Sequence, residues 1–123
     1  MKAFNRLSVL LVAGCIGVVA SAHAQNAEHG AQSFENCAPC HATNDKNGTG
    51  PGLGGIVGRK SGSAIGFRYS KAMKSANIAW NEKSLDAYLA APQEAVPGNV
   101  MPFSGIEDER ERKDLIAYLE TLK

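Results

Sequence analysis

Two thiols and an imidazole that could do metal or redox chemistry meet in one short segment, CAPCH, residues 37–41. Thiols separated by two residues can add to the two vinyl groups on one edge of a porphyrin, and an adjacent histidine can then ligate the iron. The spacing CxxCH is the attachment signature of c-type haem. The segment therefore predicts one covalently attached haem c, held by Cys37 and Cys40, with His41 as the proximal ligand.

Three other chemistries use a similar cysteine spacing. A zinc site needs four ligands and commonly a second CxxC or HxxxH pair, which this sequence lacks. A thioredoxin-like redox pair belongs at a strand-to-helix turn, and little before Cys37 reads as a strand. A disulfide between Cys37 and Cys40 would suit an oxidising compartment, but it gives no reason for His41 to follow directly.

The second axial ligand of the iron decides the class of protein. An electron carrier has both axial positions filled, whereas a peroxidase-like enzyme or a gas-binding protein leaves one open. The candidates are His29, Met73, Met101 and the lysines. We expect His29 to be a solvated surface residue and Met73 to fill space in a short helix. Met101 lies in PGNVMPF, residues 97–103, a loop shaped by proline and glycine that could hold a thioether in a fixed place.

The elements that must position these residues read as helices and loops. Residues 27–36 indicate a short helix that runs into the haem motif, with Gly30 and Phe34 on one face. The glycine-rich segment 42–66 shows little periodicity, which favours loops wrapped around a cofactor. No strand pattern competes, so we expect an all-α domain.

Three further helices are expected after these loops. Ser70 caps a short one over 71–75, and Asn81 caps a clearer one that stops before Pro92. The closing helix has acidic residues 107–109 at its positive end. The apolar stripes of the last two helices are Leu85, Tyr88 and Leu89, and Leu115, Tyr118, Leu119 and Leu122. We expect Leu115 or Tyr118 to pack across Gly30, in a fold of about four short helices and long loops around one haem.

The first 24 residues have the layout of a secretory signal peptide. Lys2 and Arg6 precede an apolar run over 7–20, and residues 22–24 (AHA) supply the small-x-small pattern before a cut. We therefore expect a single mature domain over 25–123 in the periplasm. An alternative is a lipobox ending at Cys15, which would make the protein a membrane-anchored redox module. The apolar run continues past Cys15, however, as in an ordinary signal core.

The charge balance excludes one class of partner. Without Lys2 and Arg6, 11 basic residues stand against 12 acidic ones, so the mature chain is near −1. This balance lacks the basic surface that nucleic-acid binding needs. No second segment approaches the roughly 20 apolar residues that span a bilayer, so we expect no stable membrane anchor after export.

An ordered series of motifs along nearly the whole mature sequence resembles a class I cytochrome c of the mitochondrial and soluble bacterial type. Beyond CAPCH, the matching pieces are GPGL (50–53), GRKSG (58–62), GFRYS (66–70), IAW (78–80), YL (88–89), PG (97–98) with Met101, and DLIAYL (114–119). The resemblance implies the small all-α cytochrome c fold with one covalently attached haem.

The resemblance also implies roles for residues around the haem. Met101 would be the distal ligand, the Pro51 carbonyl would support His41, and Tyr88 would lie near the Met101 sulfur. Three donors would surround the haem propionates: Arg59, Tyr69 and Trp80.

A protein of this type would carry single electrons and transform no substrate. Its partners would be larger redox complexes, such as a quinol-oxidising bc complex, an oxidase, a reaction centre or a dehydrogenase, and it would be a monomer. Gln93, Glu94 and Val100 stand where mitochondrial relatives have lysines. We therefore expect the partner to meet a mainly apolar, near-neutral surface that includes Ala38, Pro39 and Val100.

Overall fold

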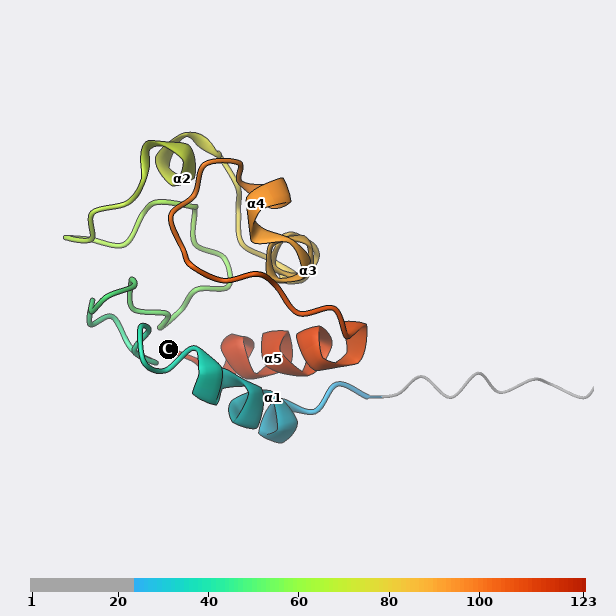
Figure 1. The fold of residues 1–123 in the computed structure, drawn as a ribbon. Coiled ribbons are helices and arrows are strands. Elements are labelled where there is room, and N and C mark those ends of the chain that lie inside the picture. Colours follow the sequence, from blue (N-terminus) through green and yellow to red (C-terminus); the bar gives the residue numbers. More distant parts are fainter. Residues whose placement is uncertain (1–23) are drawn as a thin grey trace, which may run out of the picture.

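The computed structural model describes residues 24–123, which form five helices joined by long loops (Figure 1). In chain order these are α1 (Ala27–Ser33), α2 (Lys71–Ser75), α3 (Glu82–Ala90), α4 (Pro92–Ala95) and α5 (Glu109–Thr121), with a 3₁₀ turn, Phe34–Asn36, directly after α1. Strand-like pairing over this range is limited to an isolated antiparallel bridge between Lys60 and Ala79. The all-α prediction is confirmed, with one more helix than expected.

Two sequence predictions concern the N-terminal signal peptide and the membrane. The predicted signal peptide, with Cys15, lies outside the described residues except for Ala24. Within 24–123, none of the helices combines the length and the apolar character needed to cross a bilayer.

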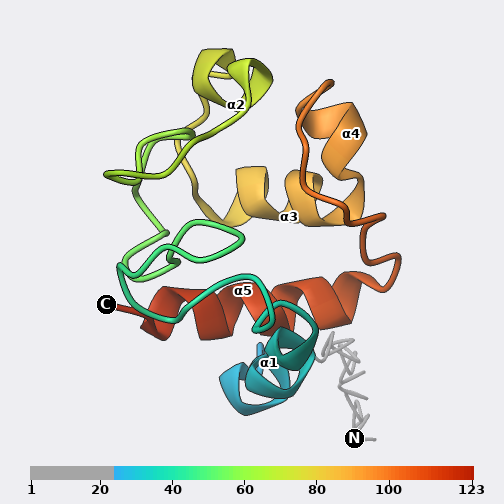
Figure 2. The ribbon, with the colours of Figure 1, turned by 60° about the vertical axis from the view of Figure 1, so that its left-hand side comes forward.

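The crossing of α1 and α5 joins two elements far apart in sequence (Figures 1 and 2). Gly30 is buried at this crossing, and a Cβ atom built on it would overlap the carbonyl oxygen of Asp114 and lie 2.9 Å from the Leu115 nitrogen. The Phe34 ring packs on Tyr118, with ring centroids 5.2 Å apart. The expected packing of the closing helix across Gly30 is confirmed.

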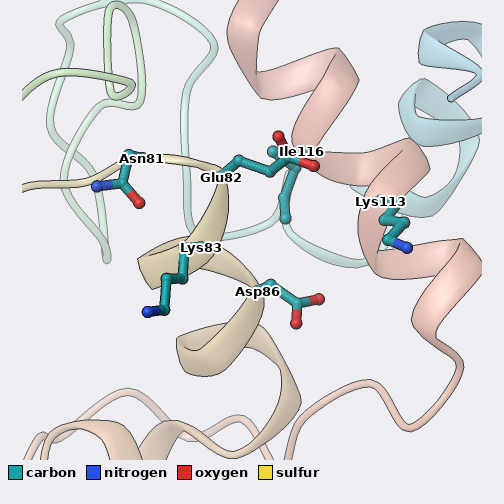
Figure 3. Close-up of a pocket in the computed structure, with 6 residues that line it drawn as sticks. All are labelled: Asn81, Glu82, Lys83, Asp86, Lys113 and Ile116. Carbon is teal, nitrogen blue, oxygen red and sulfur yellow. The ribbon is translucent and has the colours of Figure 1, made fainter.

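Most of the buried core residues belong to α3 and α5. Leu115 is 1% exposed and Ile116 is fully buried, although the predicted stripe did not include Ile116. Ile116 lies at the bottom of a groove beside α3 that Asp86 and Lys113 also line (Figure 3). Consecutive residues of α5 thus contact two neighbours, because the Leu115 backbone nitrogen lies beside Gly30 of α1 and Ile116 lies beside α3.

Side-chain caps begin the helices where the sequence indicated. The Ser70 hydroxyl accepts from the Met73 nitrogen at 3.1 Å, and Asn81 Oδ1 accepts from the Ser84 nitrogen at 3.0 Å. Pro92 differs from expectation, because it also begins α4 after α3 has ended. Proline is favoured there because the first turn of a helix leaves its N–H groups without intrahelical acceptors.

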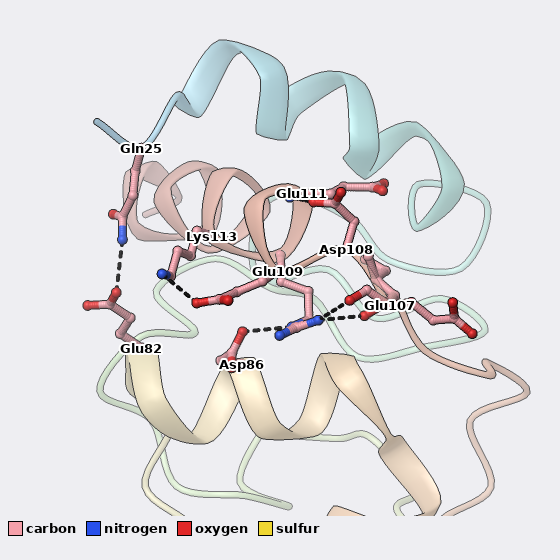
Figure 4. A network of polar contacts seen from close by, with 10 residues as sticks. Gln25, Glu82, Asp86, Glu107, Asp108, Glu109, Glu111 and Lys113 are labelled. Carbon is pink, nitrogen blue, oxygen red and sulfur yellow. Dashed lines mark hydrogen bonds and ion pairs between the residues drawn. The ribbon is translucent and has the colours of Figure 1, made fainter. Parts of the chain in front are cut away.

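Arg112 is a buried cation that connects α5 to α3 and to the loop before α5; Figure 4 labels Asp86 and Glu107, whose atoms it contacts. Its Nε donates to Asp86 Oδ1 in α3 at 2.7 Å, and its Nη1 donates to the carbonyl oxygens of Ile106 and Glu107 at 2.9 and 2.8 Å. The hydrogen bond to Asp86 is the main reason that the pKa of Arg112 is raised. Three elements therefore depend on one guanidinium.

Replacing Arg112 by alanine is expected to lower the free energy of unfolding by about 2 kcal/mol, because it leaves two carbonyls and the partly exposed carboxylate of Asp86 without their donor. The matched control is Lys113→Ala, which removes an exposed pair with Glu109 and should change the stability far less. Denaturant unfolding of the haem-loaded protein measures both values. Equal losses in the two variants would contradict the role given to Arg112.

Candidate haem-binding site

The CAPCH segment continues the turn that ends α1. The Cys37 nitrogen donates to the Phe34 carbonyl at 2.8 Å, and the His41 nitrogen donates to the Cys37 carbonyl at 3.0 Å. Cys37 and Cys40 are half-buried free thiols. Burial, and secondarily the Cys40 thiol, raises the pKa of Cys37. The turn thus presents two thiols and one imidazole from five consecutive residues.

The His41 ring is oriented by the loop that follows it. Its Nδ1 lies 2.8 Å from the Pro51 carbonyl oxygen, which can only accept, so Nδ1 carries the hydrogen. A Cβ atom on Gly50 would come within 2.7 Å of His41 Nδ1, so the absence of a side chain at Gly50 gives the ring its place. The lone pair of Nε2 is consequently available to a metal.

The Met101 loop is held by a buried amide that the sequence did not reveal. Asn99 is 6% exposed, and its Nδ2 donates to the carbonyl oxygens of Pro92 and Val96 at 2.9 and 3.0 Å. Its Oδ1 accepts from the Met101 nitrogen at 3.0 Å. The backbone of the proposed distal ligand is thereby fixed to α4.

Tyr88 places a donor beside the Met101 thioether. Its hydroxyl lies 3.5 Å from Met101 Sδ and 3.5 Å from Asn99 Oδ1. Burial raises the pKa of Tyr88 to about 12, so the hydroxyl keeps its proton at neutral pH. The Trp80 ring packs edge-on against Tyr88, with ring centroids 5.2 Å apart.

Of the three residues assigned by resemblance to the propionates, the structure brings two together. The Trp80 nitrogen donates to the Arg59 carbonyl at 2.9 Å, whereas the Tyr69 hydroxyl accepts from Ala64 within its own loop. Arg59 Nη2 donates to the Gly52 carbonyl at 2.8 Å, but its buried Nε has no partner among the described residues. A buried donor without an acceptor is rare, and a carboxylate group would satisfy this one.

The remaining candidate ligands have other contacts. The His29 side chain is 67% exposed, as expected, and its Nδ1 lies 3.3 Å from the buried carboxylate of Asp114. Met73 lies in α2, where it is half-buried and packs against the core.

Together these residues fit a covalently attached haem: two thiols at haem c spacing, an imidazole with a free Nε2, an anchored thioether and an orphaned buried guanidinium nitrogen. The class that this fold and site define is a c-type cytochrome.

The chain belongs to the cytochrome c family, whose model matches residues 27–123. It is 45% identical over 97 residues to cytochrome c2 from Rhodoplanes tepidamans, covering 77% of this chain and 91% of that protein. It is 52% identical over 82 residues to cytochrome c from Trypanosoma brucei brucei, covering 67% and 88%.

A solved structure agrees with the sequence relatives. Cytochrome cH from Methylobacterium extorquens superposes with a TM-score of 0.75 at 42% identity, covering 78% of this chain and 98% of that one. The chain is therefore a class I c-type cytochrome, which carries one covalently attached haem c and transfers electrons between redox partners.

Proposed function

We propose that this cytochrome is a periplasmic carrier in which Cys37 and Cys40 hold the haem and His41 and Met101 are its axial ligands. The observation that carries the proposal is the 2.8 Å contact between His41 Nδ1 and the Pro51 carbonyl oxygen. That contact fixes the tautomer and leaves Nε2 as the ring nitrogen that can ligate a metal. When bound, the haem supplies an iron that accepts and returns one electron.

Uncharged groups of the protein hold both ligands in place, so these contacts do not depend on the charge of the iron. Pro51 fixes His41, and Asn99 fixes the backbone of Met101. Tyr88 stays protonated and lies within reach of the Met101 sulfur. Because none of these contacts involves a group that must ionise during transfer, we expect the two oxidation states to differ little in structure, which favours fast electron transfer.

Arg59 supports the orientation of the haem in this proposal. Its Nη2 is engaged by Gly52, so the unpartnered Nε is the atom that would face a propionate. Trp80, 6% exposed and adjacent to Arg59 through the backbone, would exclude water from that side. Tyr69 would support the propionate site by holding its own loop in shape, since its hydroxyl already accepts a hydrogen bond from the Ala64 nitrogen.

The haem attachment is tested by digesting the denatured, purified protein. We expect a single peptide containing residues 37–41 that retains the mass of haem, because thioether bonds survive denaturation whereas ligand bonds do not. Cys37→Ser/Cys40→Ser is the matched variant, and it should release haem into organic solvent. A wild-type peptide that carries a disulfide and no haem would contradict the proposal.

Two further measurements separate this carrier from its alternatives. An optical spectrum of the ferric protein distinguishes six-coordinate His and Met ligation from the five-coordinate iron of a peroxidase or gas-binding protein. Membrane fractionation, together with the mass of the N-terminal peptide, distinguishes a periplasmic chain beginning at Gln25 from one lipidated at Cys15. The donor and acceptor we expect are a quinol-oxidising bc complex, an oxidase, a reaction centre or a dehydrogenase, and co-purification identifies them.

A further inference from the structure

A groove of about 410 Å³ lies beside Cys37, between the end of α1 and the start of α5. Its floor includes three half-buried side chains that also pack against the core, and its rim includes three exposed carboxylates. The floor residues are Cys37, Phe103 and Ile106, and the rim residues are Glu107, Asp108 and Glu111. We call this surface the Cys37 groove.

The rim carboxylates of the Cys37 groove are not neutralised within the described part of the chain. The three ion pairs found there join His29 with Asp114, Arg112 with Asp86, and Lys113 with Glu109. Asp108 accepts a hydrogen bond from the Glu111 nitrogen, which leaves its charge in place. None of the three rim carboxylates forms an ion pair within the described residues, and Arg110, which lies between Asp108 and Glu111 in sequence, is exposed.

The walls of the groove are fixed before any partner arrives. The Ile106 nitrogen donates to the Leu89 carbonyl at 2.8 Å, and Arg112 donates to the Ile106 and Glu107 carbonyls. Gly105 has φ 108°, and a Cβ atom there would overlap the Ala90 carbonyl oxygen. A preformed surface loses little conformational entropy on binding, which is the condition for useful affinity from a small contact.

Four of the basic side chains lie away from the Cys37 groove. Lys60, Arg68, Lys71 and Lys74 are exposed and belong to the loop before α2 and to α2 itself, at the opposite end of the molecule from α1 and α5 (Figures 1 and 2). The two ends of the molecule therefore differ in charge: four exposed cations lie at the α2 end, and the acidic rim lies beside Cys37. A partner approaching Cys37 meets carboxylates first.

We propose that the Cys37 groove is the docking site of a redox partner that presents lysine or arginine side chains around an apolar contact. The inference rests on the proposed function, in which Cys37 holds one edge of the haem. Carboxylates beside an apolar floor complement such a surface, because opposite charges raise the encounter rate and the apolar contact excludes water. This revises the near-neutral contact expected from the sequence: Ala38 and exposed Val100 carry no charge, but the neighbouring rim is acidic.

The test uses a small stand-in for such a partner, the apolar cation tris(phenanthroline)cobalt(III). Ferrous protein passes one electron to it, giving ferric protein and cobalt(II), and stopped-flow absorbance gives the rate. The variant is Glu107→Gln/Glu111→Gln in the haem-loaded protein. At an ionic strength of about 0.01 M, where charges interact over about 30 Å, we expect the rate to fall roughly tenfold. At about 0.15 M the difference should shrink to less than about threefold.

The matched control is Glu82→Gln/Glu120→Gln, which changes the net charge equally. Glu82 begins α3, far from the cluster of Glu107, Asp108 and Glu111 (Figure 4), and Glu120 lies in the last turn of α5. We expect its rate to stay within about twofold of wild type at both ionic strengths. With ferricyanide, an anionic oxidant, the groove variant should react faster than wild type, which reverses the sign of the effect.

Three results would overturn the docking site. One is an unchanged cobalt rate in the groove variant, and another is an equal fall in the control, which would indicate net charge alone. The third is self-association of the wild type at low salt that the groove variant abolishes, since the basic end of a second copy would then be the occupant. A normal haem spectrum in all variants keeps these outcomes separate from the proposed function, which fails only if the wild-type protein lacks that spectrum.

Discussion

Replacing Met101 by alanine is expected to lower the reduction potential by on the order of 100 mV or more, since axial ligands move haem potentials over about 0.8 V. A thioether stabilises the ferrous state, and its loss leaves an open axial position. Asn99 and Tyr88 would still shape the loop, so the variant should fold and bind small ligands such as imidazole or cyanide more readily. Potentiometric titration and ligand-binding spectra measure the two effects.

Met73→Leu is the matched control, because Met73 is half-buried in α2 and contacts the core through an unbranched apolar chain. We expect its potential and its ligand-binding spectra to match wild type. If the two substitutions exchanged their effects, Met73 would be the distal ligand and the assignment of Met101 would be wrong.

The second large effect is expected at Gly30. Alanine in place of glycine inside a helix normally stabilises a protein by about 0.5–1 kcal/mol. At Gly30 the added Cβ atom overlaps the Asp114 carbonyl oxygen in α5, so the helices must move apart. We expect Gly30→Ala to lower the free energy of unfolding by about 2–3 kcal/mol, and thermal or denaturant unfolding of the haem-loaded protein measures it.

The sign of the effect makes this a sharp test. Gly48→Ala is the matched control, because a Cβ atom there would lie 3.4 Å from the Cys40 carbonyl oxygen, near ordinary contact distance, in an exposed loop. Its stability should change by less than about 0.5 kcal/mol. Stabilisation by Gly30→Ala would mean that α1 and α5 do not cross closely at this residue.

Features that depend on neighbours in sequence could be predicted. Ser70 and Asn81 cap helices because their acceptors lie within three residues of the N–H groups they serve. The Gly30 and Phe34 face was also predictable, since a helical period of 3.6 places the two residues together. Its partner on α5 followed because a second apolar stripe was available to cover it.

Features that depend on long-range acceptors could not be predicted. Asn99 reads as a turn residue, and only the positions of the Pro92 and Val96 carbonyls reveal that it is buried and anchors Met101. Arg112 reads as one charge among several at the start of α5, because its acceptors Asp86 and Ile106 belong to other elements.

Some parts of the candidate site could be predicted from a local motif, some only from the family resemblance, and some not at all. CAPCH identified haem c from spacing alone, because covalent attachment needs consecutive residues. The neighbourhood of His41 and Pro51, and that of Tyr88 and Met101, followed from the resemblance to class I cytochromes c and not from any local pattern. The acidic rim of the Cys37 groove was missed because its carboxylates are about 70 residues from Cys37 in sequence and meet it only in the fold.

The crossing of α1 and α5 also sets an order of events in biogenesis. The Asn26 nitrogen donates to Asp114 Oδ1 at 2.7 Å across 88 positions of sequence. This contact cannot form until α5, 88 positions later in the chain, has been synthesised. The segment that carries Cys37, Cys40 and His41 therefore emerges long before the helix that closes over α1. We expect the attachment machinery to meet an open, extended motif, and the fold to close only after the cofactor is in place.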